Sequence, residues 1–394
     1  MEWLFNQYKS DEEFQQSYPL SPFSDEVILY LNELSSILLR MPEVRHYPDV
    51  VTFAFFCRKA NLLHLQKEHA TNSLRLGRGL VFHIAPSNVP VNFAYSLICG
   101  LLSGNNNIVR LPGKQFRQVD LIVGAIRTLS DDERFDTVSR MVHLIKYERG
   151  GIETTTYSAL ADVRVIWGGD ETIRTIRQSP LPPRSYDIAF ADRYSVCVLN
   201  AISILEEPSL DKIVEGFYND TYLFDQNACS APQLMVWVGT ADKIEKAKEY
   251  FWTALQQHVD RKYKLEPILA VDKLSAFYRQ AILSDVIKEE NKNNNLWRVR
   301  LRELSADIPQ YRCAGGYFSE YSTNDFNDLA SIVTTKYQTL AYFGFSKDEL
   351  QQFVLNNHIK GIDRIVPIGK TTDFSLIWDG YDLITMLSRE ISIL

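Results

Sequence analysis

One cysteine of the chain stands in a setting that suits nucleophilic chemistry. Cys229 lies between a stretch with helical periodicity and an apolar run, and its neighbours Ala228, Ser230 and Ala231 are small. Small neighbours leave room for a substrate to reach the sulfur, and a thiolate attacks activated acyl donors such as thioesters. The alternative is a buried cysteine that only packs. The residue types around Cys229 therefore predict acyl transfer or, failing that, an inert core thiol.

A turn that contains proline and asparagine is the second candidate. Pro86, Ser87 and Asn88 follow an apolar run over 79–85 and precede a helical stretch. In parallel sheets ligands bind beyond the carboxyl ends of strands, where the Asn88 amide could donate to an oxyanion developing on a thioester carbonyl. Pro and Asn are also ordinary turn residues, so a plain turn is the alternative.

Two glycines open a third candidate, a site for a dinucleotide. Gly168 and Gly169 join an apolar run over 163–167 to a helix that starts at Asp170. Glycines at such a junction let backbone N–H groups approach a pyrophosphate, whereas the simpler interpretation is a turn whose acidic residues offset the helix dipole. The GxGxxG fingerprint is absent, so a dinucleotide site must be built differently.

Several other enzyme classes lack their motifs in this sequence. It contains no HExxH, GxSxG or GxxxxGK[ST], and its five cysteines form no CxxC pair. We therefore expect no metal site and no disulfide framework. His83 and His143 lie in apolar runs, where a packed histidine is a simpler interpretation than a catalytic one.

The whole chain reads as a globular protein of ordinary composition. It has 394 residues, 45% hydrophobic and 23% charged, with a formal net charge of −7. This charge does not favour nucleic acid or an anionic membrane as a partner. No apolar run reaches the length of a membrane span, residues 1–22 show no signal pattern, and free cysteines favour a reducing compartment. We expect a cytoplasmic protein.

The segments that would position the candidate residues alternate between strand and helix. Helical stretches at 25–39 and 50–69 come first, and strands are then expected at 79–85, 107–111, 141–146, 163–167 and 195–199 with helices at 91–102, 119–129 and from 170. This alternation predicts an α/β fold with a parallel, doubly wound sheet. The pattern restarts with a helix at 210–224, a strand at 233–238 and a helix at 241–259.

Taken in order, these pieces resemble the aldehyde dehydrogenase superfamily and, more closely, the LuxC-type long-chain acyl-CoA reductases. The similar stretches are 82–90, 96–105 with 108–110, 165–170, 225–233, and 362–369 with 378–382. The resemblance runs from about residue 78 to the end. It implies an aldehyde dehydrogenase-like fold with a helical segment at 1–77, a Rossmann-like NADP-binding domain at 78–208, an α/β catalytic domain at 209–355 and a C-terminal return at 356–394.

The resemblance also implies a reaction. An acyl-CoA or acyl-protein thioester would acylate Cys229, and NADPH would then release an aldehyde. Asn88 and the backbone N–H of Cys229 match the oxyanion hole, while Pro86, Ser87, Arg110, Gly168 and Gly169 match the cofactor side of the site. An acyl-protein synthetase partner and a homo-oligomer are further expectations.

Two departures from the dehydrogenase pattern bear on function. The general-base glutamate of the Glu-Leu-Gly-Gly-Lys motif has no counterpart in the matching stretch 187–193, whose central positions 188–191 carry no carboxylate, and the Glu-x-Phe-Gly-Pro motif is missing near 313–316. Without a base to activate water, an acyl-enzyme persists until hydride arrives, which favours a reductase. The alternatives are an NAD(P)-dependent aldehyde dehydrogenase and a non-catalytic subunit that retains the fold.

A further position bears on the choice of cofactor. NAD-preferring relatives of this superfamily carry a ribose-binding glutamate three residues after the basic residue that matches Arg110, and this position is Gly113 here. A glycine removes a carboxylate that would repel a 2′-phosphate, and Lys114 and Arg110 add positive charge beside it. The sequence therefore predicts NADPH over NADH.

Overall fold

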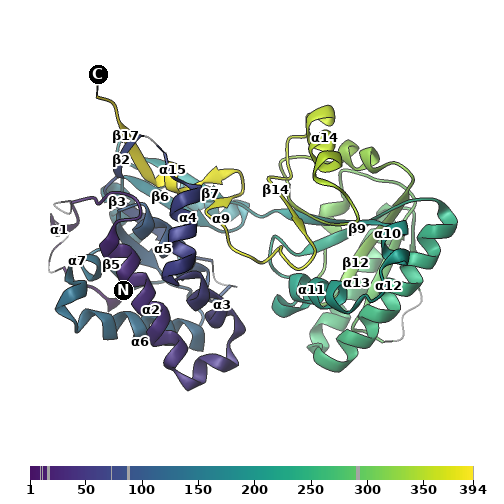
Figure 1. The fold of residues 1–394 in the computed structure, drawn as a ribbon, viewed down its shortest axis with the longest axis horizontal. Coiled ribbons are helices and arrows are strands. Elements are labelled where there is room, and N and C mark those ends of the chain that lie inside the picture. The colour runs from purple at the N-terminus through teal and green to yellow at the C-terminus, as the bar shows by residue number, and fades with distance from the viewer. Residues whose placement is uncertain are drawn as a thin grey trace. The chain divides into compact units, whose positions relative to one another are not determined.

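The chain folds into two compact units. The computed structural model describes residues 1–8, 10, 12–15, 18–71, 73–86, 89–289 and 293–393, and the predicted site residues Ser87 and Asn88 lie outside them. The first unit comprises Met1–Ala191 and Phe374–Leu394, and the second comprises Asp192–Asp373 (Figure 1). The four-domain division expected from the sequence stays a prediction.

The first unit is built on a six-stranded sheet with the order β1-β5-β4-β3-β6-β7. Its strands are β1 (Glu2–Phe5), β3 (Leu80–Ile84), β4 (Asn106–Arg110), β5 (Val142–Lys146), β6 (Val163–Trp167) and β7 (Tyr186–Phe190). All neighbours are parallel except β1 and β5. Of the parallel strands, β3 comes first in the chain, β4 and β5 follow on one side of it, and the chain then crosses to β6 on the other side. The strand order therefore reverses between β3 and β6, the place where such sheets bind ligands.

Helices cover both faces of this sheet. Val81 and Val109 pack in a cluster with the helices on one face, whereas their chain neighbours Phe82 and Ile108 pack in another cluster. The first cluster involves α2 (Asp25–Arg40), α3 (Pro48–Phe56), α4 (Lys59–Glu68), α5 (Asn92–Leu102) and α6 (Arg117–Ser130), and the second involves α8 (Glu153–Leu160) and α9 (Asp170–Ile176). Since successive strand residues point to opposite faces, burial of both faces explains the continuous apolar runs.

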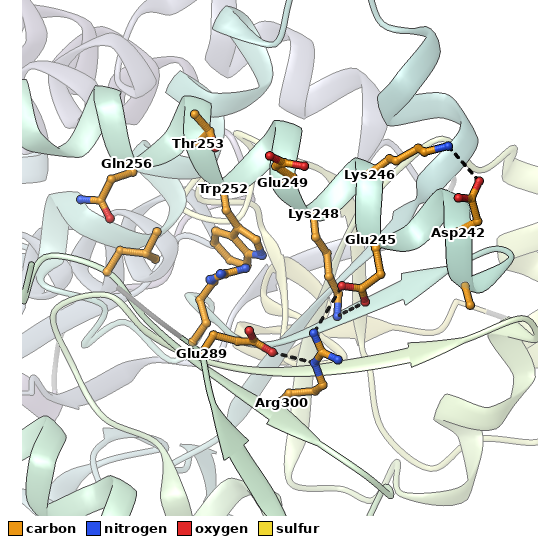
Figure 2. A pocket seen from close by; sticks show the side chains of 13 residues that line it. Asp242, Glu245, Lys246, Lys248, Glu249, Trp252, Thr253, Gln256, Glu289 and Arg300 are labelled. Carbon is orange, nitrogen blue, oxygen red and sulfur yellow. Dashed lines mark hydrogen bonds and ion pairs between the residues drawn. The ribbon is translucent and has the colours of Figure 1, made fainter. Parts of the chain in front are cut away.

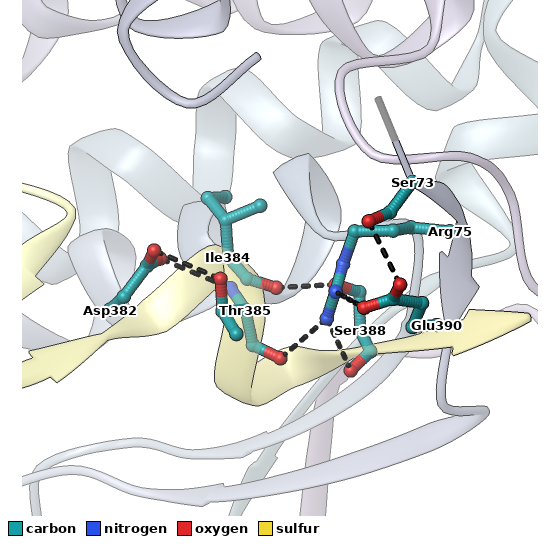
Figure 3. A network of polar contacts seen from close by, with 7 residues as sticks. All are labelled: Ser73, Arg75, Asp382, Ile384, Thr385, Ser388 and Glu390. Carbon is teal, nitrogen blue, oxygen red and sulfur yellow. Dashed lines mark hydrogen bonds and ion pairs between the residues drawn. The ribbon is translucent and has the colours of Figure 1, made fainter. Parts of the chain in front are cut away.

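The C-terminal segment completes the first unit. β17 (Ser388–Ile391) pairs antiparallel with β2 (Leu74–Gly77), and Figure 3 shows the polar network around this pair. Arg75 donates through Nε to Ser388 Oγ at 2.8 Å and through its terminal nitrogen to the Thr385 carbonyl at 3.0 Å. Glu390 accepts from Ser73 Oγ at 2.9 Å and pairs with Arg75. Residues more than 300 positions apart are thus joined. The other short elements of this unit are α1 (Glu12–Gln15), η1 (Pro42–His46), η2 (Glu133–Phe135), α7 (Asp136–Ser139), β15 (Ile377–Trp378), β16 (Tyr381–Asp382) and α15 (Leu383–Leu387).

The second unit is built on a seven-stranded sheet with the order β10-β11-β12-β9-β8-β13-β14. Its strands are β8 (Tyr194–Asn200), β9 (Pro232–Val238), β10 (Val286–Lys288), β11 (Trp297–Leu301), β12 (Tyr317–Thr323), β13 (Tyr337–Phe343) and β14 (Arg364–Pro367). All neighbours are parallel except β10 and β11. The amino ends of β8, β9, β12 and β13 therefore meet at one edge of the sheet.

Helices and 3₁₀ turns pack on this second sheet as well (Figure 1). They are α10 (Ala201–Glu206), α11 (Asp211–Thr221), η3 (Tyr222–Phe224), α12 (Ala241–Lys262), α13 (Pro267–Leu283), η4 (Ile308–Tyr311), η5 (Phe326–Ser331) and α14 (Lys347–Asn357). Within the described part of the chain, no helix combines the length and apolarity needed to cross a lipid bilayer.

The structure differs from the sequence prediction at two elements. The apolar run at 195–199 forms β8, but β8 pairs with β9 and β13 of the second sheet and not with the first sheet. An apolar run predicts a strand and says nothing about its pairing partner. The helix predicted over 50–69 is two helices, because the chain breaks at Cys57 and Arg58, and the Lys59 N–H that opens α4 donates to Asn32 Oδ1 at 2.9 Å.

Candidate active site

Cys229 lies in the loop that leads into β9, and its thiol side chain is partly exposed. Cys57, Cys99 and Cys197 are buried, and burial raises the pKa of each of these thiols. Cys313 is partly exposed as well, and burial raises its pKa too. Only two of the five thiols are thus open to a substrate, and Cys229 is the one flanked by small residues.

The loop that carries Cys229 is held in an unusual backbone conformation. Asp225 and Gln226 both have positive φ angles, of 51° and 61°. Non-glycine residues adopt this region only when surrounding contacts compensate for it. The Gln226 side chain is buried and donates to the carbonyls of Pro232 at 2.9 Å and Tyr317 at 3.1 Å. Its Oε1 accepts from the Gly316 N–H at 2.9 Å. Gln226 therefore fixes the loop against the start of two strands.

Gly316 contributes to this arrangement by its lack of a side chain. Its φ is +88°, and a Cβ there would lie 2.3 Å from the Asn295 carbonyl oxygen and 2.4 Å from Tyr222 Oη. The N–H of the preceding Gly315 donates to the Asp225 carbonyl at 2.9 Å. A larger residue at position 316 would therefore clash with Asn295 and Tyr222, while the Gly315 hydrogen bond ties the segment before β12 to the cysteine loop.

The carbonyl of Cys229 is anchored to the neighbouring strand. Ser195 Oγ donates to it at 2.6 Å and in turn accepts from the Thr339 N–H at 3.2 Å. Ser195 is fully buried at the start of β8, and Thr339 is fully buried in β13. The position of the cysteine backbone is thus set by three adjacent parallel strands.

Charged side chains gather at the same sheet edge. Arg312 grips Asp192 with two N–H···O contacts of 2.7 and 2.8 Å and donates to the Arg193 carbonyl at 3.1 Å. Lys336 Nζ also reaches Asp192, at 3.1 Å. The Arg312 guanidinium is close enough to Cys229 for their charges to interact, and this interaction, together with the stronger effect of Asp192, raises the pKa of Arg312 although burial opposes it.

The electrostatics of Asp192 follow from these contacts. Burial on its own would raise the pKa of this carboxyl, but the hydrogen bonds and charges of Arg312 and Lys336 outweigh it and hold the pKa below its usual range. Asp192 is therefore a weakly basic carboxylate. The sequence shows no signal for Arg312 or Lys336, because their common partner lies 120 and 144 positions away.

Asp187, the other carboxylate that flanks the window 188–191, is also engaged by arginine side chains. Asp187 accepts from Arg164 Nε at 2.7 Å and from Arg177 Nε at 3.1 Å, and the Arg164 side chain is only 2% exposed. From its place on β7, Asp187 thus neutralises the buried guanidinium of Arg164 on β6. Neither Asp187 nor Asp192 is a free carboxylate of the kind a general base requires.

The predicted cofactor residues that the structure describes lie at the carboxyl ends of neighbouring strands of the first sheet. Pro86 comes two residues after β3, Arg110 ends β4, and Gly168 and Gly169 follow β6. The structure therefore brings them to the point where the strand order reverses. A Cβ on Gly169 would have no neighbour within 4 Å, so its backbone faces open space, whereas a Cβ on Gly168 would lie 3.2 Å from the Thr172 side chain.

Arg110 and the exposed loop after it offer positive charge at the same edge of the sheet as these glycines. The Arg110 guanidinium stacks on the Tyr147 ring at 4.7 Å and donates to the Tyr147 carbonyl at 3.2 Å. Its Nε is buried without a hydrogen-bond partner among the described residues. Gly113 has open space around it, and Lys114 is exposed. An unsatisfied guanidinium N–H and an open glycine loop fit a ligand that carries phosphate and ribose groups.

The two histidines are packed, as predicted. His83 is fully buried, with Ser96 Oγ at 2.7 Å and Asn107 Oδ1 at 3.0 Å from its ring nitrogens. His143 is buried too and lies 2.7 Å from Asn6 Oδ1. Burial lowers the pKa of His83 to about 4 and that of His143 to about 3. Both stay neutral at physiological pH.

A surface hollow of about 680 Å³ lies elsewhere, along α12 and the start of the second sheet's edge strands (Figure 2). Several of its charges are paired with one another: Lys246 with Asp242 at 3.1 Å, and Arg300 with Glu245 at 3.3 Å and with Glu289 at 2.7 Å. Its lining shares no residue with the cysteine loop. The hollow reads as a salt-bridged surface. No group of three His, Cys, Asp or Glu side chains within the described ranges is arranged to hold a metal ion.

Comparison with known proteins identifies the family and the fold. The sequence profile of the family described as acyl-CoA reductase (LuxC) matches residues 24–390. A long-chain acyl-protein thioester reductase of Vibrio harveyi is 22% identical over 304 residues, which cover 75% of this chain and 60% of that protein. Another of Aliivibrio fischeri is 24% identical over 191 residues, which cover 48% of this chain and 37% of that protein. The chain thus spans less than two thirds of the length of these curated relatives.

Among solved structures, a 1-pyrroline-5-carboxylate dehydrogenase from Thermus with bound NAD superposes with a TM-score of 0.62 at 12% identity. The superposition covers 96% of this chain and 82% of that one. At this identity the likeness shows the fold alone, and it confirms the aldehyde dehydrogenase-like α/β architecture expected from the sequence. Because the family profile spans nearly the whole chain, the protein belongs to the acyl-CoA reductase (LuxC) family.

Proposed function

We propose that this protein is an acyl-thioester reductase that forms an acyl-enzyme on Cys229 and reduces it to an aldehyde with NADPH. Family membership supports the reaction class. The observation that carries the proposal is the setting of Cys229, a partly exposed thiol on a rigid loop with a guanidinium close enough to interact with its charge. Cationic neighbours favour the thiolate over the thiol, and the thiolate is the nucleophile.

The acylation step places defined tasks on this chain's residues. The Cys229 sulfur attacks the carbonyl carbon of an acyl-CoA or acyl-protein thioester, a new S–C bond forms, and the donor leaves as its own thiolate. The Arg312 guanidinium stabilises the attacking thiolate, Asp192 holds that guanidinium in place, and Lys336 holds Asp192. The family resemblance assigns two donors to the oxyanion that develops on the carbonyl oxygen, the backbone N–H of Cys229 and the Asn88 amide.

The reduction step depends on a bound dinucleotide. NADPH, when bound, supplies the hydride that converts the acyl-enzyme to an aldehyde and returns Cys229 as a thiolate. Gly168 and Gly169 present backbone N–H groups to its pyrophosphate, and Arg110 and Lys114 present positive charge to its ribose phosphate. Gly113 leaves the 2′-phosphate without a repelling carboxylate.

The lack of a general base separates reduction from hydrolysis. Positions 188–191 carry no carboxylate, and both flanking aspartates are engaged by arginines. General-base assistance typically accelerates hydrolysis by about 10² to 10⁴. The acyl-enzyme is therefore expected to wait for hydride and not to be lost to water.

A single-turnover mass measurement tests this proposal. Incubation with acyl-CoA without cofactor should add one acyl group to Cys229, stable for many times the reduction half-life, and NADPH should then discharge it as aldehyde. Cys229→Ala should abolish labelling, whereas Cys313→Ala, which removes the other partly exposed thiol, should retain it. Labelling of the Cys229→Ala protein would refute the nucleophile. Fast cofactor-independent release of free acid would instead indicate a dehydrogenase or hydrolase, and no labelling at all would indicate an interaction subunit.

The oxyanion donor can be tested in the same assay. Removing one such donor typically slows the step by roughly 100- to 1,000-fold. Asn88→Ala should therefore slow acylation of Cys229 within that range, with the circular dichroism spectrum unchanged. A loss of less than about tenfold would mean that Asn88 is only a turn residue.

A further inference from the structure

The surface helix α13 (Pro267–Leu283) buries polar side chains and exposes apolar ones. Its fully buried side includes Lys273 and Gln280. Its outward side exposes large apolar side chains, with exposed fractions between 43% and 79%: Ile268, Val271, Leu274, Tyr278, Ile282 and Leu283. An ordinary surface helix buries such residues and exposes its lysines.

Hydrogen bonds show that this orientation is specific. Lys273 Nζ donates to the carbonyls of Asn294, at 2.6 Å, and Gly315. Gln280 accepts from Tyr317 Oη at 2.7 Å. Buried polar groups are costly unless they are bonded. Lys273 and Gln280 are hydrogen-bonded, and rotating α13 to bury its apolar side would break these bonds. The buried hydrogen bonds therefore keep the apolar side of α13 exposed.

The exposed apolar residues form one seam. Ile268, Val271, Tyr278 and Ile282 follow alternating steps of three and four residues, with the small Ser275 in the middle position. This spacing is that of a helix that packs along another helix. Side chains of this kind, each more than half exposed, add up to an apolar patch on the order of 400 Å², at the upper end of what monomers expose.

We propose that this seam is covered by α13 of a second copy of the chain, packed antiparallel about a two-fold axis that passes beside Ser275. A two-fold interface requires a self-complementary surface, in which residues equally far from the axis face each other. Ile268 and Ile282 lie seven residues to either side of Ser275, so Ile268 of one copy faces Ile282 of the other. Val271 lies four residues before Ser275 and Tyr278 three residues after it, so the two come within one residue of facing each other, and the two serines allow the helices to approach closely at the crossing point.

Charge complementarity supports the same register. Asp272 and Arg279 lie on one flank of the seam, three residues before and four residues after Ser275, and both are exposed. The antiparallel arrangement places Asp272 of each copy beside Arg279 of the other, twice per dimer. Arg279 uses one terminal nitrogen on the Gln310 carbonyl, at 3.1 Å, and has further N–H groups to donate. A parallel pairing would place this flank of the two copies on opposite sides of the seam, so that Asp272 and Arg279 would not pair across it.

The size of the seam is compatible with a specific dimer. A standard interface buries about 800 Å² on each partner, with an apolar centre and a polar rim. The seam supplies about half of that area as the apolar centre, and the charged flank of α13 supplies part of the rim. The inference concerns assembly and does not depend on the proposed reaction.

Sedimentation velocity on the full chain, over a dilution series in the micromolar range, tests the inference. The unaltered protein should be a dimer. Ile282→Lys, which places a charge in the seam, should produce a monomer, whereas the matched control Lys264→Glu, just before the helix, should stay dimeric. Every changed residue is exposed, and circular dichroism verifies that each variant is folded.

A charge swap tests the antiparallel register itself. Asp272→Arg alone and Arg279→Asp alone should each raise the dimer dissociation constant by about tenfold or more, because each sets like charges together. The double variant should restore the original constant. A monomeric unaltered protein would overturn the inference and leave the seam to a different protein or chain segment. A dimer that Ile282→Lys leaves intact, or a double swap that fails to restore association, would overturn it as well.

Discussion

The guanidinium of Arg312 offers a quantitative test of the active-site electrostatics. Arg312→Gln removes a positive charge that interacts with Cys229 while keeping a side chain of similar length that can still hydrogen-bond to Asp192. Among the described residues, Lys336 then remains as the cationic partner of Asp192, so the site also becomes more negative. Both changes disfavour the Cys229 thiolate.

The size of the effect follows from Coulomb's law. For an assumed separation of about 6 Å, two unit charges interact by roughly 0.7 kcal/mol at a dielectric constant of about 80 and by roughly 1.4 kcal/mol at about 40. The higher values of a dry interior do not apply, because the Arg312 side chain is 40% exposed and solvent screens its charge. These energies correspond to a shift of roughly 0.5 to 1 pH unit in the titration of the thiol.

Alkylation by iodoacetamide as a function of pH measures this shift. Cys313→Ser serves as the background, so that Cys229 is the reporting thiol, with Cys57, Cys99 and Cys197 buried. In this background Arg312→Gln should move the alkylation midpoint upward by roughly 0.5 to 1 unit, with the rate at high pH unchanged. Other groups at this edge that could contribute are Lys336, Tyr194 and the Arg193–Asp363 pair, and none of them is altered.

Two controls make the result decisive. Arg312→Lys keeps the charge but loses the two-pronged contact with Asp192, and should shift the midpoint by less than the glutamine variant does. Arg302→Gln removes an exposed guanidinium that pairs with Asp285, and should leave the midpoint unchanged. If Arg312→Gln left the midpoint in place, or lowered the plateau rate alone, the guanidinium would be structural and the account of thiolate stabilisation would be wrong.

Three further predictions follow from other parts of the molecule. Gly113→Glu should weaken NADPH binding more than NADH binding in a fluorescence titration, and equal kcat/KM values for the two nucleotides in the unaltered protein would contradict the reasoning. Ala189→Glu, with Phe190→Glu as the alternative position, should shorten the lifetime of the acyl-enzyme by supplying a base for water; an unchanged lifetime in both variants would argue against the alignment of this stretch. The stability of the protein should depend on pH through His83, whose pKa burial lowers to about 4. Below about pH 6.5 the His83 side chain takes up a proton in the unfolded chain but not in the folded chain. The free energy of unfolding should therefore have its full value above that pH and fall toward pH 4 by up to about 1.4 kcal/mol per pH unit. Urea titrations should show a shallower slope for His83→Gln, and an identical slope would mean that other groups set the dependence.

Part of this structure could be predicted from the sequence because the signals are local. The runs that became β3, β4 and β6 are continuous and apolar, since both faces of a central parallel strand are buried. The small neighbours of Cys229 and the paired glycines after β6 are also local signals. Each marks a candidate position without any knowledge of what lies across from it.

The remainder depends on contacts between distant residues. Arg312 reaches Asp192 only because β12, β9 and β8 are neighbours in the second sheet, and a strand order of that kind is not written in any short segment. For the same reason, the sequence does not show that β8 pairs with β9 and β13 and not with strands of the first sheet. In α13 the periodicity itself misleads, because it favours burying Ile268 and Ile282, while Lys273 occupies the buried position through carbonyl groups supplied by other parts of the chain.

The interrupted course of the first unit has a consequence for how the protein is made. The second unit is a continuous stretch, Asp192–Asp373, and the first unit needs residues on both sides of it. On the ribosome, the second unit can fold as soon as it has emerged, whereas β2 must wait for β17, which is synthesised more than 300 residues later. During that interval the first unit exposes the apolar side chains against which Leu383, Ile384 and Leu387 later pack. Chaperone dependence and sensitivity to C-terminal truncation should therefore concentrate in the half of the molecule that is synthesised first.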